Sequence, residues 1–267
     1  NPKFYFYSTH LISNYFEINN YEKVRKLLEN FNKEDEIYYW YKLKKISQII
    51  YNEQGSKESL SYIEKKFKNY SNVPIKIIYD MANIYKRNKE FEKSIEYYSK
   101  LLNKLIDNSE ESADILYKRG SSYERLGDEK NSDKDLLKSL SIKPDDPYVL
   151  NYLAYSWLER GYKIQEAINM LDKAYNQKKN DPYIIDSVGW GYYLVGDFKN
   201  AENFLKKALQ LMPTDPVVND HYGDVLWKLN RRIEAQYYWE SALNSKDSEN
   251  EMKINISKKL LKGLDES

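Results

Sequence analysis

The chain has 267 residues, of which 31% are charged, and its mean hydropathy is -0.82. Basic and acidic residues nearly cancel, giving a formal net charge of +1, which argues against nucleic acid as a partner. Cysteine is absent, which excludes disulfides, thiolate nucleophiles and cysteine-ligated zinc. The sequence lacks the run of roughly eighteen apolar residues that predicts a membrane-spanning helix.

The first elements in chain order are weak helix pairs. Residues 5–38, 40–73 and 75–112 are each predicted to form two helices separated by a polar turn. Only the third pair carries a small apolar residue, Ala82, where its helices should cross. Ile12 stands at the same place in the first pair, so the repeat pattern fades toward the N-terminus.

Clearer repeats follow, with a period near 34 residues. Gly189 and Gly223 are 34 residues apart, and so are Ala201 and Ala235. Small residues at a fixed spacing predict places where two helices approach closely. The predicted repeats in this part of the chain are 113–146, 147–181, 182–215 and 216–249.

Within one such repeat the glycine, alanine, proline and aspartate positions each have a local structural role. Gly189 and Ala201 are predicted at the helix crossing, and Gly196 at the turn between the two helices. Pro213 ends the second helix, and Asp215 precedes the next one.

This pattern resembles the tetratricopeptide repeat. The resemblance implies an all-α fold, a right-handed superhelix of about seven helix pairs plus a C-terminal capping helix. It covers nearly the whole chain and implies a single superhelical domain over residues 1–267.

The two ends of the chain differ. Residues 251–264 carry apolar side chains at every fourth position, which predicts an amphipathic capping helix. Residues 4–7 form an apolar run without a polar cap before it. We therefore expect that further repeats or another domain precede this end, so that the chain is a fragment of a longer protein. Self-association through this end is the alternative.

The sequence offers no set of residues for catalysis. His10 and His221 are the two histidines, and about six repeats separate them. His221 and Asp224 could supply two metal ligands, but two are too few for a closed zinc site. His221 is therefore predicted to lie on a helix surface. We expect no enzyme activity, no cofactor and no metal.

The resemblance implies that the first helix of each pair lines a concave groove, and that this groove binds a partner protein or peptide. The positions used by the family predict the following groove residues: Asn83, Arg87, Tyr117, Tyr148, Asn151, Tyr155, Tyr183, Asp186, Trp190, Tyr193, Asp220, Asp224, Trp227 and Lys228.

The large rings in this set have two interpretations. Trp190, Trp227 and their neighbouring tyrosines either contact a partner or pack against the next repeat. Asp186, Asp220 and Asp224 would favour a basic or amide-rich partner.

A clamp for a C-terminal carboxylate, as in some chaperone-binding members of the family, is not predicted. Lys44 and Gln48 could begin such a clamp, but Asp80 stands where an asparagine is needed.

Residues 145–243 also resemble a group of proteobacterial envelope repeat proteins. The resemblance rests on the stretches 151–157, 186–190 and 219–224, with Trp239. Some members are outer-membrane lipoproteins that bring a processing protease to cell-wall hydrolases. The resemblance implies a non-enzymatic adaptor in the periplasm or at the outer membrane. A cytoplasmic assembly scaffold and the repeat region of a larger enzyme are the alternatives.

Overall fold

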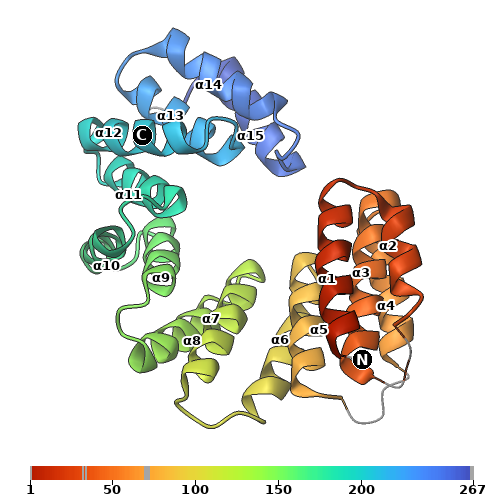
Figure 1. The fold of residues 1–267 in the computed structure, drawn as a ribbon. Coiled ribbons are helices and arrows are strands. Elements are labelled where there is room, and N and C mark those ends of the chain that lie inside the picture. The colour runs from red at the N-terminus through yellow and green to blue at the C-terminus, as the bar shows by residue number, and fades with distance from the viewer. Residues whose placement is uncertain (1, 32, 34, 69–72, 265–267) are drawn as a thin grey trace. The chain divides into compact units, whose positions relative to one another are not determined.

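The computed structural model describes residues 2–31, 33, 35–68 and 73–264, and all regular elements in these ranges are α-helices (Figure 1). The all-α prediction is confirmed. The helices are α1 (Pro2–Glu17), α2 (Tyr21–Leu28), α3 (Glu36–Gln54), α4 (Ser56–Phe67), α5 (Ile75–Arg87), α6 (Phe91–Leu102), α7 (Glu110–Arg125), α8 (Glu129–Ile142), α9 (Pro147–Glu159), α10 (Ile164–Gln177), α11 (Pro182–Leu194), α12 (Phe198–Leu211), α13 (Pro216–Lys228), α14 (Arg232–Asn244) and α15 (Asn250–Lys262).

Aspartate–proline pairs start three of these helices. The side chains of Asp146, Asp181 and Asp215 each accept hydrogen bonds from two backbone N–H groups of the first turn. The proline that follows each aspartate lacks the backbone N–H that would be unpaired in the first turn of a helix. Its fixed φ angle also suits a helix. The sequence therefore fixes where α9, α11 and α13 begin.

The chain forms two compact units, which are described separately. Unit 1 comprises residues 1–107 with 125–128, and unit 2 comprises residues 108–124 with 129–267. A single superhelical domain over the whole chain stays a prediction.

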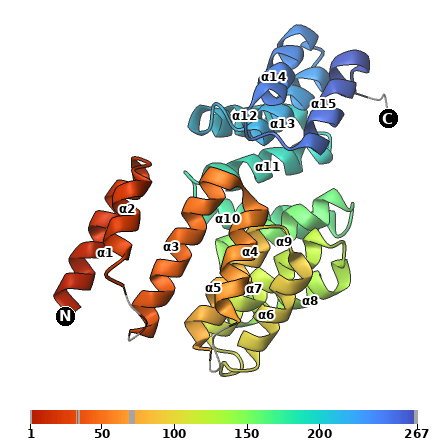
Figure 2. The same ribbon diagram turned by 90° about the vertical axis from the view of Figure 1, so that its right-hand side faces the viewer.

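Unit 1 is held together by two apolar clusters. Ile12, Leu28 and Ile49 are fully buried and join α1, α2 and α3. Trp40 and Met81 belong to the second cluster, which joins α3, α4 and α5. Figure 2 shows α3, α4 and α5 as neighbours within this unit.

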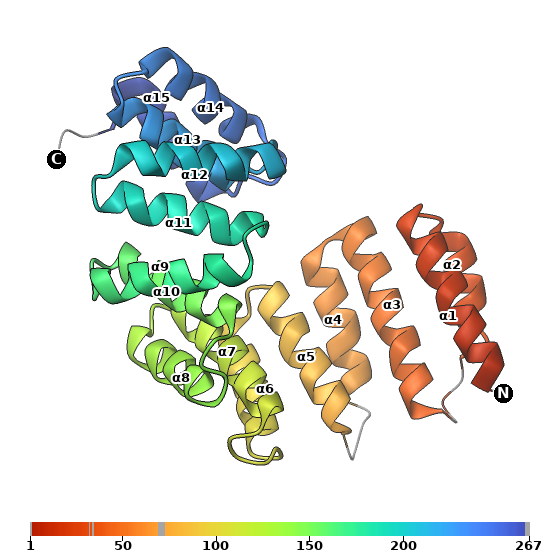
Figure 3. The ribbon, with the colours of Figure 1, turned by 60° about the vertical axis from the view of Figure 1, so that its left-hand side comes forward.

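In unit 2 successive helices pack in chain order, as Figure 3 shows for α9 to α14. In the α11–α12 and α13–α14 pairs the two helices approach each other at a glycine. A Cβ atom added at Gly189 would lie 2.6 Å from Cγ of Leu205. One added at Gly223 would lie 2.5 Å from Cδ1 of Trp239. These distances explain why glycine recurs at this position of the repeat.

Each predicted repeat contains one helix pair, although some helices start earlier than the sequence pattern indicates. Helix α3 begins at Glu36, because Asp35 caps it by accepting a hydrogen bond from the backbone N–H of Tyr38 at 3.2 Å. Helix α7 begins at Glu110, before the predicted boundary at residue 113.

The two end helices differ in burial. Helix α15 places Ile256 in the last apolar cluster of unit 2, with Met252 and Leu260 packed against it. Helix α1 leaves Tyr7 and Leu11 exposed. Phe4, which belongs to the predicted apolar run, lies outside the residues whose side chains are described.

Candidate partner-binding face

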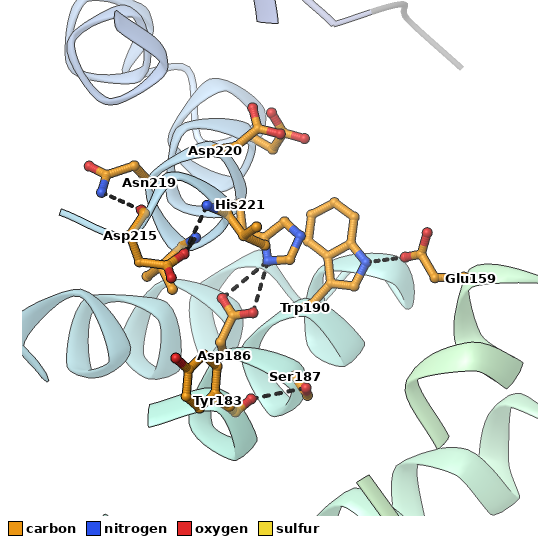
Figure 4. A network of polar contacts seen from close by, with 12 residues as sticks. Glu159, Tyr183, Asp186, Ser187, Trp190, Asp215, Asn219, Asp220 and His221 are labelled. Carbon is orange, nitrogen blue, oxygen red and sulfur yellow. Dashed lines mark hydrogen bonds and ion pairs between the residues drawn. The ribbon is translucent and has the colours of Figure 1, made fainter. Parts of the chain in front are cut away.

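A stack of rings joins α11 and α13 (Figure 4). The ring of His221 on α13 lies 4.0 Å from the indole of Trp190 on α11, with an interplanar angle of 13°. Trp190 stacks in turn on Tyr193, at 4.6 Å and 14°. The indole Nε1 of Trp190 donates a hydrogen bond to Glu159 at the end of α9. Side-chain contacts therefore connect three successive first helices.

His221 is buried and paired, so the predicted surface position is wrong. Its Nδ1 lies 3.1 Å from both carboxylate oxygens of Asp186, and the residue is only 6% exposed. Burial alone would lower the pKa of His221, but the charges of Asp186, Asp220 and Asp224 raise it above the usual value. The imidazolium is stable here because Asp186 neutralises it and Trp190 offers its ring face.

Two further carboxylates, both on α13, share one lysine of α15. Nζ of Lys259 lies 2.8 Å and 2.9 Å from the oxygens of Asp220, and 2.8 Å from both oxygens of Asp224. The indole of Trp239 also donates to Asp224, at 2.8 Å. Burial raises the pKa of Asp224 to about 6, and Asp220 adds to the shift, while Lys259 opposes it. Both acids are therefore bonded within the chain.

These pKa shifts predict that unit 2 loses stability as the pH rises. The pKa of His221 is higher in the folded state, so its contribution is complete below the unfolded value of about 6.5. It is lost as the pH rises through the folded pKa. The pKa of Asp224 is also higher in the folded state. Its contribution to stability is therefore lost as the pH rises from about 4 to about 6. Urea unfolding followed by circular dichroism should show a lower midpoint at pH 8 than at pH 6.

The two histidines provide a matched comparison for this prediction. His221→Gln should flatten the stability profile above about pH 6.5, whereas His10→Gln should not, because His10 is exposed. Equal pH profiles for the two variants would show that the buried histidine does not set the pH dependence.

Residues 75–103 and 113–146 match the family described as tetratricopeptide repeat. A TPR repeat-containing protein of Pseudomonas aeruginosa is 35% identical over 114 residues, which are 43% of this chain and 19% of that relative. The chain therefore contains tetratricopeptide repeats. Its match spans about a fifth of that relative's length.

Solved repeat structures share the fold. A tetratricopeptide repeat protein from Parabacteroides merdae superposes with a TM-score of 0.72 and 16% identity, over 96% of this chain and 98% of that one. PilW, described as a widely conserved type IV pilus biogenesis factor, gives a TM-score of 0.60 and 19% identity, over 72% of this chain and 87% of that one.

Two of the predicted groove residues of this repeat protein lie in unit 1. Asn83 accepts a hydrogen bond from the hydroxyl of Tyr98 at 2.9 Å and donates one to the carbonyl of Tyr79 at 2.8 Å. Arg87 is exposed, and its guanidinium lies 5.7 Å from the centre of the Tyr51 ring.

The other predicted residues belong to the repeats of unit 2. Asp186, Trp190, Tyr193, Asp220 and Asp224 form the network described above. We call the surface that these five residues share with Tyr155 and Tyr183 the α9–α11–α13 face. Side chains at positions 183, 186, 190 and 193 follow the spacing of one helix side, so α11 presents them together.

Trp227 packs against residues of its own repeat. Its ring lies 5.2 Å from Trp239, and the guanidinium of Arg232 lies 5.1 Å from its centre. These contacts are of the kind that the packing interpretation predicts. Lys228 is half-buried at the end of α13.

The predicted groove tyrosines that remain are exposed or half-buried. Tyr148 and Tyr183 are exposed, and Tyr117 meets Tyr152 edge to face at 5.8 Å. Tyr155 is half-buried, and burial followed by the charges of Glu159 and three other carboxylates raises its pKa.

Asn151, one turn before Tyr155 on α9, has an amide oxygen that is buried. This oxygen accepts no hydrogen bond from the residues that the structure describes.

Sequence reasoning missed His221 and Lys259 as members of this network. His221 follows Asp186 by 35 residues, and Lys259 follows Asp224 by the same interval. This interval is close to one repeat. A search for opposite charges one repeat apart would have found both pairs.

Within the described ranges, no group of three or more histidine, cysteine, aspartate or glutamate residues is arranged to hold a metal ion. None of the described helices is long and apolar enough to span a membrane.

Proposed function

We propose that this repeat protein is a non-enzymatic scaffold that holds a segment of a partner protein on the α9–α11–α13 face. The observation that carries the proposal is Tyr183, a residue that is 65% exposed beside a network that fixes its helix. Tyrosine rings presented on a rigid support contribute binding energy at a low entropic cost.

Two glutamates whose charges act on Tyr155 of this face support a basic partner. Glu124 accepts a hydrogen bond from the hydroxyl of Tyr152 at 2.9 Å, and Glu159 accepts one from the indole of Trp190. Both donors are neutral, and neither glutamate forms an ion pair with a residue that the structure describes. These two glutamates, rather than Asp220 and Asp224, would supply the attraction, mainly through the association rate.

We place the partner in the bacterial cell envelope, as an enzyme that processes proteins or cell wall. The support is the resemblance of residues 145–243 to envelope repeat proteins. A native protein that fractionates with the cytosol would favour the assembly-scaffold alternative, and a catalytic domain elsewhere in the same polypeptide would favour the enzyme alternative.

The test uses two tyrosines of equal exposure. Tyr183 is 65% exposed on α11, and Tyr237 is 66% exposed on α14, the second helix of its pair. A photo-crosslinking phenylalanine analogue at position 183 should capture a specific partner in the native cell, and the same analogue at position 237 should not.

The captured partner is then purified and its affinity measured. Tyr148→Ser with Tyr183→Ser should weaken binding at least about tenfold, while Tyr237→Ser should leave it unchanged. If the two serine sets bind the partner equally well, the α9–α11–α13 face is not the binding surface.

A further inference from the structure

The second helices of successive pairs in unit 2 lie against one another. Helices α8 and α10 share one apolar cluster. Tyr175 on α10 meets Phe204 on α12 edge to face at 5.3 Å, and Glu202 on α12 is bonded to Arg231, the residue before α14. Equivalent positions of these helices therefore lie on one common side of unit 2.

The exposed side of α8, α10 and α12 is basic. Each helix buries a small residue, which is Ser132, Ala167 or Ala201, and the residues four and seven positions after it. The residues two before it and two, five and six after it point to the opposite side. We call this side the α8–α10–α12 face. It carries six exposed lysines: Lys130, Lys134, Lys138, Lys173, Lys199 and Lys206.

These lysines are not neutralised within the chain. Every carboxylate of α8, α10 and α12 except Asp172 is paired with a cation outside the face, as Asp133 is with Arg160. None of the six lysines forms an ion pair with a residue that the structure describes. The formal net charge of +1 for the whole chain therefore conceals a strongly basic surface.

The next second helix replaces lysine with exposed apolar side chains. Ile233 on α14 follows Lys199 by 34 residues and is 85% exposed. Tyr237, one turn later on the same side, is 66% exposed. Leu137, which is 43% exposed, lies among the lysines of α8. The basic face therefore continues directly into a small apolar patch.

This combination fits a lipid surface. Lysines attract anionic phosphates, and their long apolar stems can lie along the acyl boundary. A nucleic acid would also attract lysines, but it would gain little from an exposed isoleucine, whereas the interface of a bilayer accepts both. We propose that the α8–α10–α12 face, together with Ile233 and Tyr237, binds the surface of a membrane that contains anionic phospholipid.

This surface goes beyond the proposed function, because second helices form it and first helices form the α9–α11–α13 face. A membrane and a partner protein would then bind to different helices of unit 2. Tyr237 would contact lipid, which agrees with its expected failure to capture a partner protein.

The test measures sedimentation of the full chain with vesicles of phosphatidylcholine, with and without phosphatidylglycerol. The chain should bind only the vesicles with phosphatidylglycerol, and added salt should weaken binding. A lysine near an anionic surface strengthens binding about fivefold. Lys134→Glu with Lys199→Glu should therefore weaken binding at least about tenfold, with an unchanged circular dichroism spectrum.

The matched control is Lys258→Glu with Lys262→Glu. Both lysines are exposed on α15, and the change in net charge is the same. This variant should bind the vesicles as the wild type does. The proposal is overturned if it loses as much affinity as the first variant, or if the wild type does not bind anionic vesicles at about 1 mM lipid.

A second measurement follows the apolar patch. The chain has no cysteine, so a single one can carry an environment-sensitive fluorophore. The label on Ile233→Cys should shift to shorter wavelength with anionic vesicles, and the label on Asn255→Cys, exposed on α15, should not. An unshifted label at position 233 on bound protein would contradict the proposal. Tighter binding to a DNA duplex than to the vesicles, with the same dependence on Lys134 and Lys199, would make this a nucleic-acid surface instead.

Discussion

Replacing Lys259 with methionine should destabilise the C-terminal part of unit 2 by about 3–5 kcal/mol at pH 7. Lys259 contacts all four oxygens of the partly buried Asp220 and the buried Asp224 and is the cation that they share. Methionine keeps the apolar stem but removes the charge. Two neighbouring carboxylates would then face each other without a counter-ion, which costs more than the loss of the hydrogen bonds alone.

Hydrogen exchange of the amides in α13 to α15 measures this loss, which should appear as at least about 100-fold faster exchange. Lys258→Met is the control, because Lys258 is exposed and adjacent. Adding Asp220→Asn and Asp224→Asn to Lys259→Met should restore most of the protection. The interpretation fails if Lys258→Met costs as much, or if the two asparagines restore nothing.

Gly223→Ala should destabilise the crossing of α13 and α14 by about 2–3 kcal/mol. The added methyl group would lie 2.5 Å from Cδ1 and 2.6 Å from Nε1 of Trp239, and 3.2 Å from the carbonyl oxygen of Ala235. Trp239 is fully buried and its indole is bonded to Asp224, so the ring cannot move without breaking that bond.

Gly191→Ala provides a graded comparison on α11. Its added methyl group would meet only the side-chain ends of Leu171 and Leu158, at 3.1 Å and 3.2 Å. Alanine also favours a helix by about 1 kcal/mol over glycine, so this variant should be close to neutral. Urea unfolding followed by circular dichroism ranks the two variants, and equal midpoints would mean that Trp239 can shift at little cost.

The repeat pairs of unit 2 could be predicted because their determinants are local. Gly189 and Gly223 mark the crossings, and Asp181 and Asp215 cap helix starts, so spacing alone locates them. The start of α3 was harder to locate, because its cap at Asp35 precedes the first residue of the repeat pattern.

The candidate face was predictable only in part. Residue positions within one helix indicate which side chains share a side, so Tyr183, Asp186 and Trp190 were found together. Their partners were not, because His221 and Lys259 come from later repeats and their pairing depends on how the repeats stack. Position in a repeat also does not say whether a ring remains exposed, as Tyr183 does, or is partly buried against another ring, as Trp227 is.

The contacts between first helices have a consequence for how unit 2 melts. Glu159 is bonded to Trp190, Asp186 to His221, and Asp220 to Lys259. These contacts join α9 to α11, α11 to α13, and α13 to α15. In a linear array the strength of such neighbour terms decides whether segments open singly or as a block. The Asp186–His221 and Asp220–Lys259 contacts are charged and largely buried, which makes these terms large. We therefore expect α11 to α15 to exchange their most protected amides at one common rate, as a single cooperative segment.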